Sequence, residues 1–243
     1  MSGPDRWMEQ AKSVWESWRV HLVRLTPGPK VTPEQLQSSD ALARWRAVRA
    51  LTGRPAPDLL PELIRLAGDE DELVRAAAVD TLVSWGPTVV LGPVREALAA
   101  QPAPAVAVSL LCILARLPDP AHRAVIQPWL DADEPEVRAG AFMALAALCD
   151  DADLPLLEDA LAEEDISVQR AIMATLCAPE AGPLAAKAAA TSDPILRQRA
   201  GQAGPRIQRH LEVKRQADAR AKKKQSAAES QSAAAEKSPE KSP

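Results

Sequence analysis

The chain has 243 residues, of which 47% are apolar and only 3% aromatic, with no tyrosine and no asparagine. Alanine and leucine dominate, which favours helices over strands, so we expect an all-α fold. The net charge of −4 is unevenly divided, because residues 58–165 hold 21 acidic against 6 basic side chains and residues 206–243 hold 5 against 10. An acidic centre repels phosphate backbones, which excludes nucleic-acid binding except through the basic ends.

The first expected helix covers residues 5–25. Its apolar residues recur at steps of three and four and include Trp7, Trp15 and Trp18. Three tryptophans on one helix could form a membrane or ligand platform, but the charges around them are mixed, whereas an anionic membrane selects a basic face. We therefore expect residues 1–30 to form a capping helix for the domain that follows. Since no run of 18 apolar residues occurs, we expect no membrane contact and a cytoplasmic location.

One sequence pattern then recurs six times. Its clearest copies are residues 71–82 (DELVRAAAVDTL) and residues 134–145 (EPEVRAGAFMAL). The fourth residue of each copy, called the anchor below, recurs at intervals of 31, 32, 31, 31 and 28 residues: Ala43, Val74, Val106, Val137, Val168 and Leu196. So regular a period indicates stacked structural units.

Each copy is expected to form a helix. In four copies an aspartate stands three residues before the anchor, where it can accept the free amides of the first turn and oppose the helix dipole: Asp40, Asp71, Asp165 and Asp193. A shorter amphipathic segment precedes each copy, which makes every unit a helical hairpin. These segments are residues 32–37, 59–66, 91–98, 122–130, 153–161 and 182–188.

The motif Asp-x-x-Val-Arg-x-Ala-Ala-x-x-x-Leu at a period near 31 resembles the short HEAT-like repeats of the phycobilisome-lyase type. The resemblance implies a right-handed α-solenoid of about six hairpins over residues 31–212. It also implies a structural role for the arginine after the anchor, which in this family usually pairs with an aspartate of a neighbouring repeat. That arginine is present in four copies, as Arg44, Arg75, Arg138 and Arg197.

The sequence contains no recognisable catalytic or metal-binding motif. The three histidines are far apart in the sequence, and no glycine-rich phosphate loop or nucleophile elbow occurs. The acidic clusters fall at the starts of helices, where capping explains them. We expect no metal and no cofactor. The three cysteines lie in expected helices. We therefore expect them to act as small apolar core residues, and we expect no disulfide framework.

Most proteins with such repeats are binding scaffolds. We therefore expect a non-catalytic scaffold or adaptor whose concave groove, lined by the second helix of each hairpin, takes a helix or extended segment of a protein partner. Small residues at the centre of the groove either admit that partner or pack against the next repeat. The expected groove residues are Trp45, Arg46, Arg49, Asp80, Arg170 and Arg199.

Two catalytic alternatives follow from the resemblance alone. A chromophore (bilin) lyase would need groove cations for propionates, and nothing marks a bilin site. An alkyl-base DNA glycosylase would need a carboxylate beside an aromatic residue and a continuous basic track, and only Trp45 and Asp80 offer such a pair.

The apolar periodicity fades near Lys214. Residues 213–243 are rich in Ala, Ser, Lys and Glu and cannot bury enough apolar surface to offset the entropy of ordering, so we expect a disordered basic tail. The tail either makes weak contacts with nucleic acid or serves only to keep the protein in solution.

Overall fold

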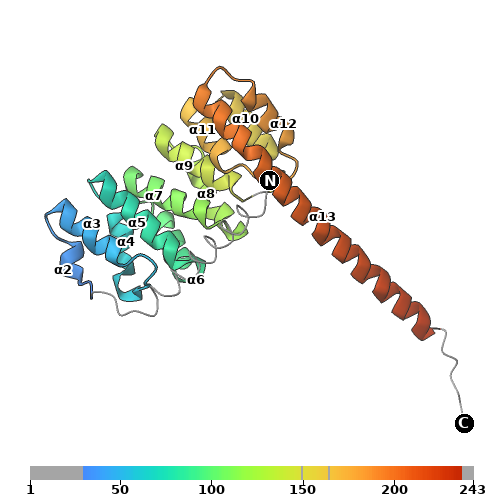
Figure 1. Ribbon diagram of the computed structural model, residues 1–243, viewed down its shortest axis with the longest axis horizontal. Helices are drawn as coiled ribbons and strands as arrows, with labels where there is room; N and C mark the ends of the chain where they lie inside the picture. The colour runs from blue at the N-terminus through green and yellow to red at the C-terminus, as the bar shows by residue number, and fades with distance from the viewer. Residues whose placement is uncertain (1–29, 149, 164, 237–243) are drawn as a thin grey trace, which may run out of the picture. The chain divides into compact units, whose positions relative to one another are not determined.

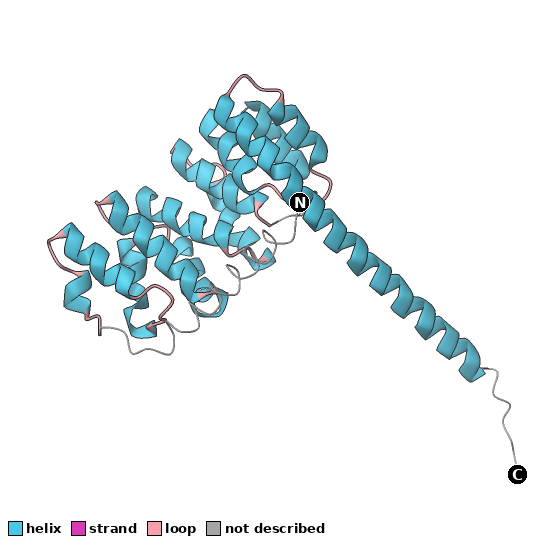
Figure 2. Ribbon diagram, viewed as in Figure 1, coloured by secondary structure: helices cyan, strands magenta, loops and turns pink. Residues whose placement is uncertain are grey.

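The computed structural model describes residues 30–148, 150–163 and 165–236. Within these ranges every regular element is a helix and no strand occurs, which confirms the all-α prediction (Figures 1 and 2). The chain divides into two compact units, Met1–Leu145 and Ala146–Pro243. The predicted capping helix of residues 1–30 lies, apart from its last residue, outside the described residues.

The described helices form six hairpins in chain order. They are α2 (Pro33–Leu36) with α3 (Ala41–Ala50), α4 (Leu60–Leu66) with α5 (Glu72–Trp85), α6 (Pro87–Ala99) with α7 (Pro104–Arg116), α8 (Arg123–Ile126) with α9 (Pro135–Ala146), α10 (Leu154–Glu163) with α11 (Ile166–Thr175), and α12 (Gly182–Ala189) with α13 (Pro194–Glu236). Short 3₁₀ turns lie at Pro57–Leu59, Pro120–His122, Gln127–Trp129 and Asp151–Asp153. Each hairpin matches a predicted one, and most boundaries agree within a few residues.

The predicted aspartate caps are present. Asp71 accepts the backbone amides of Leu73 at 2.9 Å and Val74 at 3.1 Å, and Asp40 accepts the amide of Leu42 at 3.1 Å. Asp165 and Asp193 cap α11 and α13 in the same way. Each cap satisfies amides that the first turn leaves without a helical partner.

The helix α6 begins four residues earlier than the sequence predicts. Gly86 ends α5 with a φ of 83°, in the left-handed region that favours glycine, and Pro87 then occupies the first position of α6. A sharp break of this kind lets two long helices follow each other without a loop.

The core of the first unit is a stack of second helices. On α5, Val74, Ala78 and Leu82 are completely buried and form the predicted apolar stripe. This helix packs against α3 on one side and α7 on the other, with α4 and α6 as the outer layer. The spacing of the motif thus predicts which face of each helix is buried.

Polar side chains of α5 also bind the end of α3. The indole Nε1 of Trp85 donates to the carbonyl of Leu51 at 2.8 Å, and the hydroxyl of Thr81 donates to the carbonyl of Val48 at 3.2 Å. Both carbonyls also accept a backbone amide, Val48 from Leu51 and Leu51 from Arg54. The following repeat therefore supplies a second donor to each carbonyl, which joins the two hairpins.

The second unit repeats this arrangement with a different side chain. Arg206 of α13 donates through Nη2 to the carbonyl of Met173 at 2.6 Å and through Nε to that of Leu176 at 3.4 Å. Both acceptors lie at the end of α11. Burial lowers the pKa of Arg206, and the two carbonyls offset part of the cost of burying its charge.

Two predictions differ from the structure here. Helix α13 continues to Glu236, although residues 213–243 were expected to be disordered. Residues 206–236 contain no glycine or proline and many alanine, lysine, arginine and glutamine residues, all good helix formers, so the helix can continue without burying apolar surface. Cys177 is disulfide-bonded, whereas Cys112 keeps a free thiol. We had expected Cys177 within a helix, but it lies just after the end of α11.

Candidate functional site

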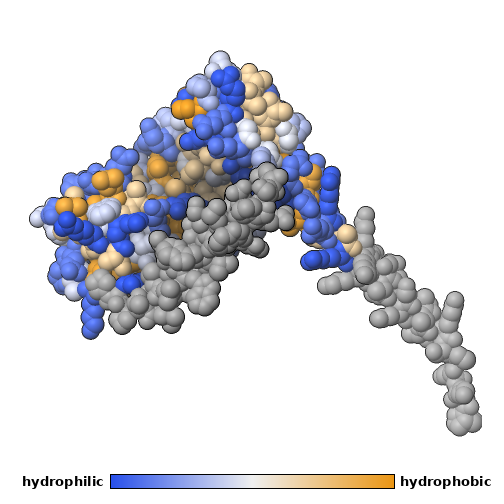
Figure 3. Space-filling model, viewed as in Figure 1, coloured by the Kyte–Doolittle hydropathy of each residue, from blue (hydrophilic) through white to orange (hydrophobic). Residues whose placement is uncertain are grey.

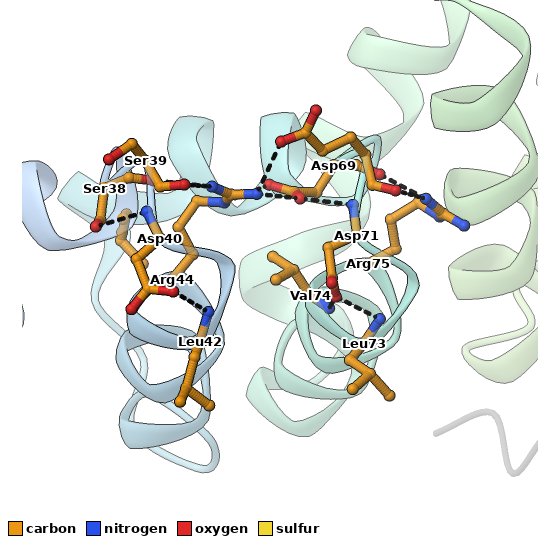
Figure 4. Close-up of polar contacts among 12 residues, drawn as sticks. Ser38, Ser39, Asp40, Leu42, Arg44, Asp69, Asp71, Leu73, Val74 and Arg75 are labelled. Atoms are coloured by element: carbon orange, nitrogen blue, oxygen red, sulfur yellow. Dashed lines mark hydrogen bonds and ion pairs between the residues drawn. The ribbon is translucent and has the colours of Figure 1, made fainter.

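The arginine after the first anchor forms a buried ion pair with the next repeat (Figure 4). Arg44 of α3 donates through Nε to Asp69 Oδ2 at 2.8 Å and through Nη2 to Oδ1 at 2.7 Å. The two side chains are 8% and 4% exposed. Asp69 lies in the turn before α5, so the pairing with a neighbouring repeat that the resemblance implied is present here.

A second contact of these arginines was not predicted. Nη1 of Arg75 donates to the carbonyls of Asp69 and Glu70, six and five residues earlier, at 2.6 and 3.0 Å. Arg44 and Arg138 make the same two bonds to the turns before their own helices. The repeated arginine therefore stabilises the turn between the two helices of its hairpin by hydrogen bonds to the carbonyls of that turn. Arg197 is exposed and makes no such bond within the described residues.

The predicted groove residues of the first repeat lie on one face of α3. Trp45 is half-buried, whereas Arg46 and Arg49 are exposed and have no ion-pair partner in the described part of the chain. Arg49 is three positions after Arg46 and four after Trp45, so its side chain is a neighbour of both on the helix surface.

The other predicted groove charges are already paired. Asp80 forms an ion pair with Arg116 of α7 at 2.6 Å. Arg170 pairs with the cap Asp193 of the next helix, and the hydrogen bond from Arg170 holds the pKa of Asp193 below its usual value. Arg199 donates to the carbonyl of Arg170 at 2.7 Å. In the second unit these arginines join successive helices instead of presenting free charge.

Two exposed leucines were missed by the sequence analysis. Leu42 is 49% exposed and Leu73 is 69% exposed. Each lies in the first turn of its helix, three residues before Trp45 and Ala76 respectively, on the same face as the predicted groove positions. Figure 4 shows both side chains on neighbouring helices, directed away from the Arg44–Asp69 pair. The sequence does carry a signal for these two leucines, because each directly precedes the anchor of its copy.

We call this surface the second-helix face of the first unit. It comprises Leu42, Trp45, Arg46 and Arg49 on α3, Leu73, Ala76 and Asp80 on α5, and Val108, Cys112 and Arg116 on α7. In Figure 3 apolar residues, in orange, reach the surface of the first unit among polar ones.

The small residues expected at the centre of the groove divide into two groups. Ala77, Ser109, Gly140 and Ala171 are buried between helices. A Cβ at Gly140 would lie 3.4 Å from Leu111, which shows how closely α9 approaches α7. The positions one residue earlier, such as Ala76 and Val108, remain at least partly exposed. Packing between helices therefore accounts for the first group, whereas the second group leaves small side chains at the surface.

A hollow of about 510 Å³ lies beside this face, between α2 and α3. Its walls combine small apolar residues with a few charged ones: Lys30, Val31, Glu34, Gln35, Ser38, Ala43, Arg46, Ala47 and Ala50. Arg46 therefore borders both the hollow and the second-helix face.

The described residues offer few groups suited to metal or nucleophilic chemistry. Among the described residues, no cluster of three or more His, Cys, Asp or Glu could hold a metal ion. His122 is buried, and its Nε2 lies 2.9 Å from the carbonyl of Leu117. Burial raises the pKa of the half-buried Cys112 thiol, although Arg116 opposes this effect, and a protonated thiol is a poor nucleophile.

Comparison with known proteins gives one match. A family model described as HEAT repeats matches residues 30–111 and again residues 91–177, which together exceed half of the chain. No curated protein matches the sequence. Within the described residues, no helix has the length and apolar character needed to cross a bilayer.

Proposed function

The chain belongs to the HEAT-repeat family, and from this we propose that it is a non-catalytic scaffold that binds a protein partner through the second-helix face of its first unit. Proteins built from stacked helical repeats offer extended surfaces on which a helix or an extended segment of a partner can lie. The proposal narrows the predicted groove, which drew residues from the whole array, to α3, α5 and α7.

The observation that carries the proposal is the exposure of Leu42 and Leu73. They are the two most exposed leucines among the described residues, and they lie on the adjacent helices α3 and α5, the first of which also carries the half-buried Trp45. Adjacent exposed apolar residues with a charged border are typical of protein-binding surfaces. Aromatic and arginine side chains commonly supply most of the binding energy in such surfaces.

The state of Asp80 supports a binding role over a glycosylase-like one. A catalytic carboxylate would have to be free to act on a flipped base, but Asp80 is occupied by Arg116 at 2.6 Å. A bilin lyase could use groove arginines to neutralise propionates: Arg46 and Arg49 have no ion-pair partner among the described residues, whereas Arg170 is paired with Asp193. No specific observation in this geometry favours either the glycosylase or the bilin lyase.

A cytoplasmic location is our proposal for this scaffold. The disulfide at Cys177 counts against it, because thiols are kept reduced in the cytosol of most cells.

Replacing Leu42 and Leu73 together by alanine should remove the bound partner. Both side chains are largely exposed in the free protein, so the melting temperature should stay close to that of the wild type. The measurement is a pull-down from native extract with quantitative mass spectrometry, comparing wild type with the Leu42→Ala/Leu73→Ala variant.

A matched control is Leu156→Ala, which truncates a leucine of α10, in the second unit, that is 43% exposed. It should retain every partner. If the two variants lose the same proteins, or neither loses any, the second-helix face is not the binding surface.

The end of α13 is a separate candidate, for weak contact with nucleic acid. Lys214 is held by Asp151 at 2.6 Å, so a deletion that begins at residue 221 leaves this contact in place and removes the Lys222 to Lys224 run. If that run binds nucleic acid, deleting residues 221–243 should abolish a salt-sensitive gel shift of single-stranded RNA or DNA. A shift that survives the deletion would place the contact elsewhere.

A further inference from the structure

We propose that the partner presents an acidic amphipathic segment, with apolar side chains that contact Leu42, Trp45 and Leu73 and carboxylates that pair with Arg46 and Arg49. This inference rests on the proposed function, since it names the chemistry of the ligand for the same face.

The charge of the face is concentrated on α3. Arg46 and Arg49 are exposed, three residues apart, and unpaired in the described part of the chain. On the two neighbouring helices the charges of Asp80 and Arg116 cancel each other. The face therefore carries an excess of two positive charges at one end, although the surrounding residues 58–165 are strongly acidic.

The spacing of the two arginines fits carboxylates on a helical ligand. Side chains three or four positions apart on a helix lie about 5–6 Å from each other at Cβ. Two glutamates or aspartates one turn apart can thus reach Arg46 and Arg49 at the same time, and charge-assisted hydrogen bonds to guanidinium groups are among the stronger polar contacts.

The apolar part of the ligand has two places to bind. Leu42 and Leu73 form the exposed contact, and the hollow of about 510 Å³ beside Arg46 has walls of Val31, Ala43 and Ala47 that leave room for a large side chain. Its rim carries Lys30 and Glu34, so that the hollow is apolar at its wall and charged at its edge. An apolar residue near a carboxylate matches this combination.

Charge complementarity favours an acidic protein over nucleic acid. A phosphate backbone requires cations along its whole path, whereas here the unpaired cations of the face occupy only α3, and α5 beside it carries the exposed Glu72. Two carboxylates on a protein segment need only the two free arginines.

The test is selection of peptides from a random display library on the full-length protein, followed by measurement of their affinity. The selected peptides should combine Asp or Glu with Leu, Ile or Phe. The Arg46→Glu/Arg49→Glu variant should bind them at least tenfold more weakly, and higher salt should weaken wild-type binding. The matched control Arg197→Glu/Arg220→Glu reverses two exposed arginines of α13 and should leave the affinity unchanged.

Other outcomes separate this inference from the proposed function. Peptides that depend on Leu42 and Leu73 but lack acidic residues would overturn the inference and leave the binding face standing. Peptides that bind equally well to the Leu42→Ala/Leu73→Ala variant would overturn the face itself.

Two further results would also refute an acidic protein segment as the ligand. One is binding of a fluorescent single-stranded oligonucleotide that the Arg46→Glu/Arg49→Glu variant loses. The other is a homodimer, seen by light scattering, that the same variant dissociates.

Discussion

Trp85→Ala should lower the free energy of unfolding by about 3–5 kcal/mol, the usual range for removing a buried aromatic side chain. Trp85 is 3% exposed, and its indole donates to the carbonyl of Leu51 in the preceding hairpin. The substitution removes apolar contacts and also the side-chain hydrogen bond to the carbonyl of Leu51. Urea denaturation followed by far-UV circular dichroism measures the change.

Trp85→Phe is the matched variant, because it keeps most of the apolar volume and removes the hydrogen bond. We expect it to cost about 1–2 kcal/mol. Amide hydrogen exchange should accelerate near Val48 and Leu51 in both variants, since these residues lose their connection to α5. A similar loss from both substitutions would show that packing contributes little at this position.

Arg44→Ala should cost about 3 kcal/mol, because it leaves the carboxylate of Asp69 buried without its counter-ion. It also removes the donor to the carbonyls of Ser38 and Ser39. Arg197→Ala is the control, since it truncates the equivalent arginine of the sixth repeat, which is exposed and has no bond to its turn. That variant should unfold at nearly the wild-type urea concentration. Equal losses from the two substitutions would refute a special role for the buried pair.

The contribution of this pair should depend on pH. Burial acts to raise the pKa of Asp69, but the hydrogen bonds from Arg44 and from the amide of Asp71 outweigh it, so the pKa lies below its ordinary value. A carboxyl group with a lowered pKa in the folded state stabilises the protein above its unfolded pKa, about 3.9 for aspartate, and loses that contribution as the pH falls through the folded value. The difference in stability between wild type and Arg44→Ala should therefore shrink below about pH 4.

The sequence predicts those parts of the fold that depend on neighbouring residues. The caps at Asp71 and Asp165 follow from a side chain and amides two or three positions away, so the starts of their helices were predicted to within a residue. The buried stripe of α5 follows from the helical period. The length of α13 does not follow from burial, because its last turns rest on the helix propensity of residues 206–236.

The candidate site could be predicted only in part, since pairing between distant residues decides which charges are free. Asp80 and Arg116 are 36 residues apart, and Arg170 and Asp193 are 23 apart. Nothing in the sequence distinguishes these paired arginines from Arg46 and Arg49. The exposed Leu42 and Leu73 were predictable from helical position, but the residue before the anchor was not considered.

The bonds from one hairpin to the end of the previous one give the array a direction. The carbonyl of Leu51 accepts a side-chain bond from Trp85, 34 residues later, and that of Met173 accepts one from Arg206, 33 residues later. During synthesis, neither bond can form until the ribosome has released roughly one more repeat, because the chain emerges from its N-terminus. A nascent chain stopped between these residues would therefore hold a hairpin whose end still lacks its bond to the next repeat.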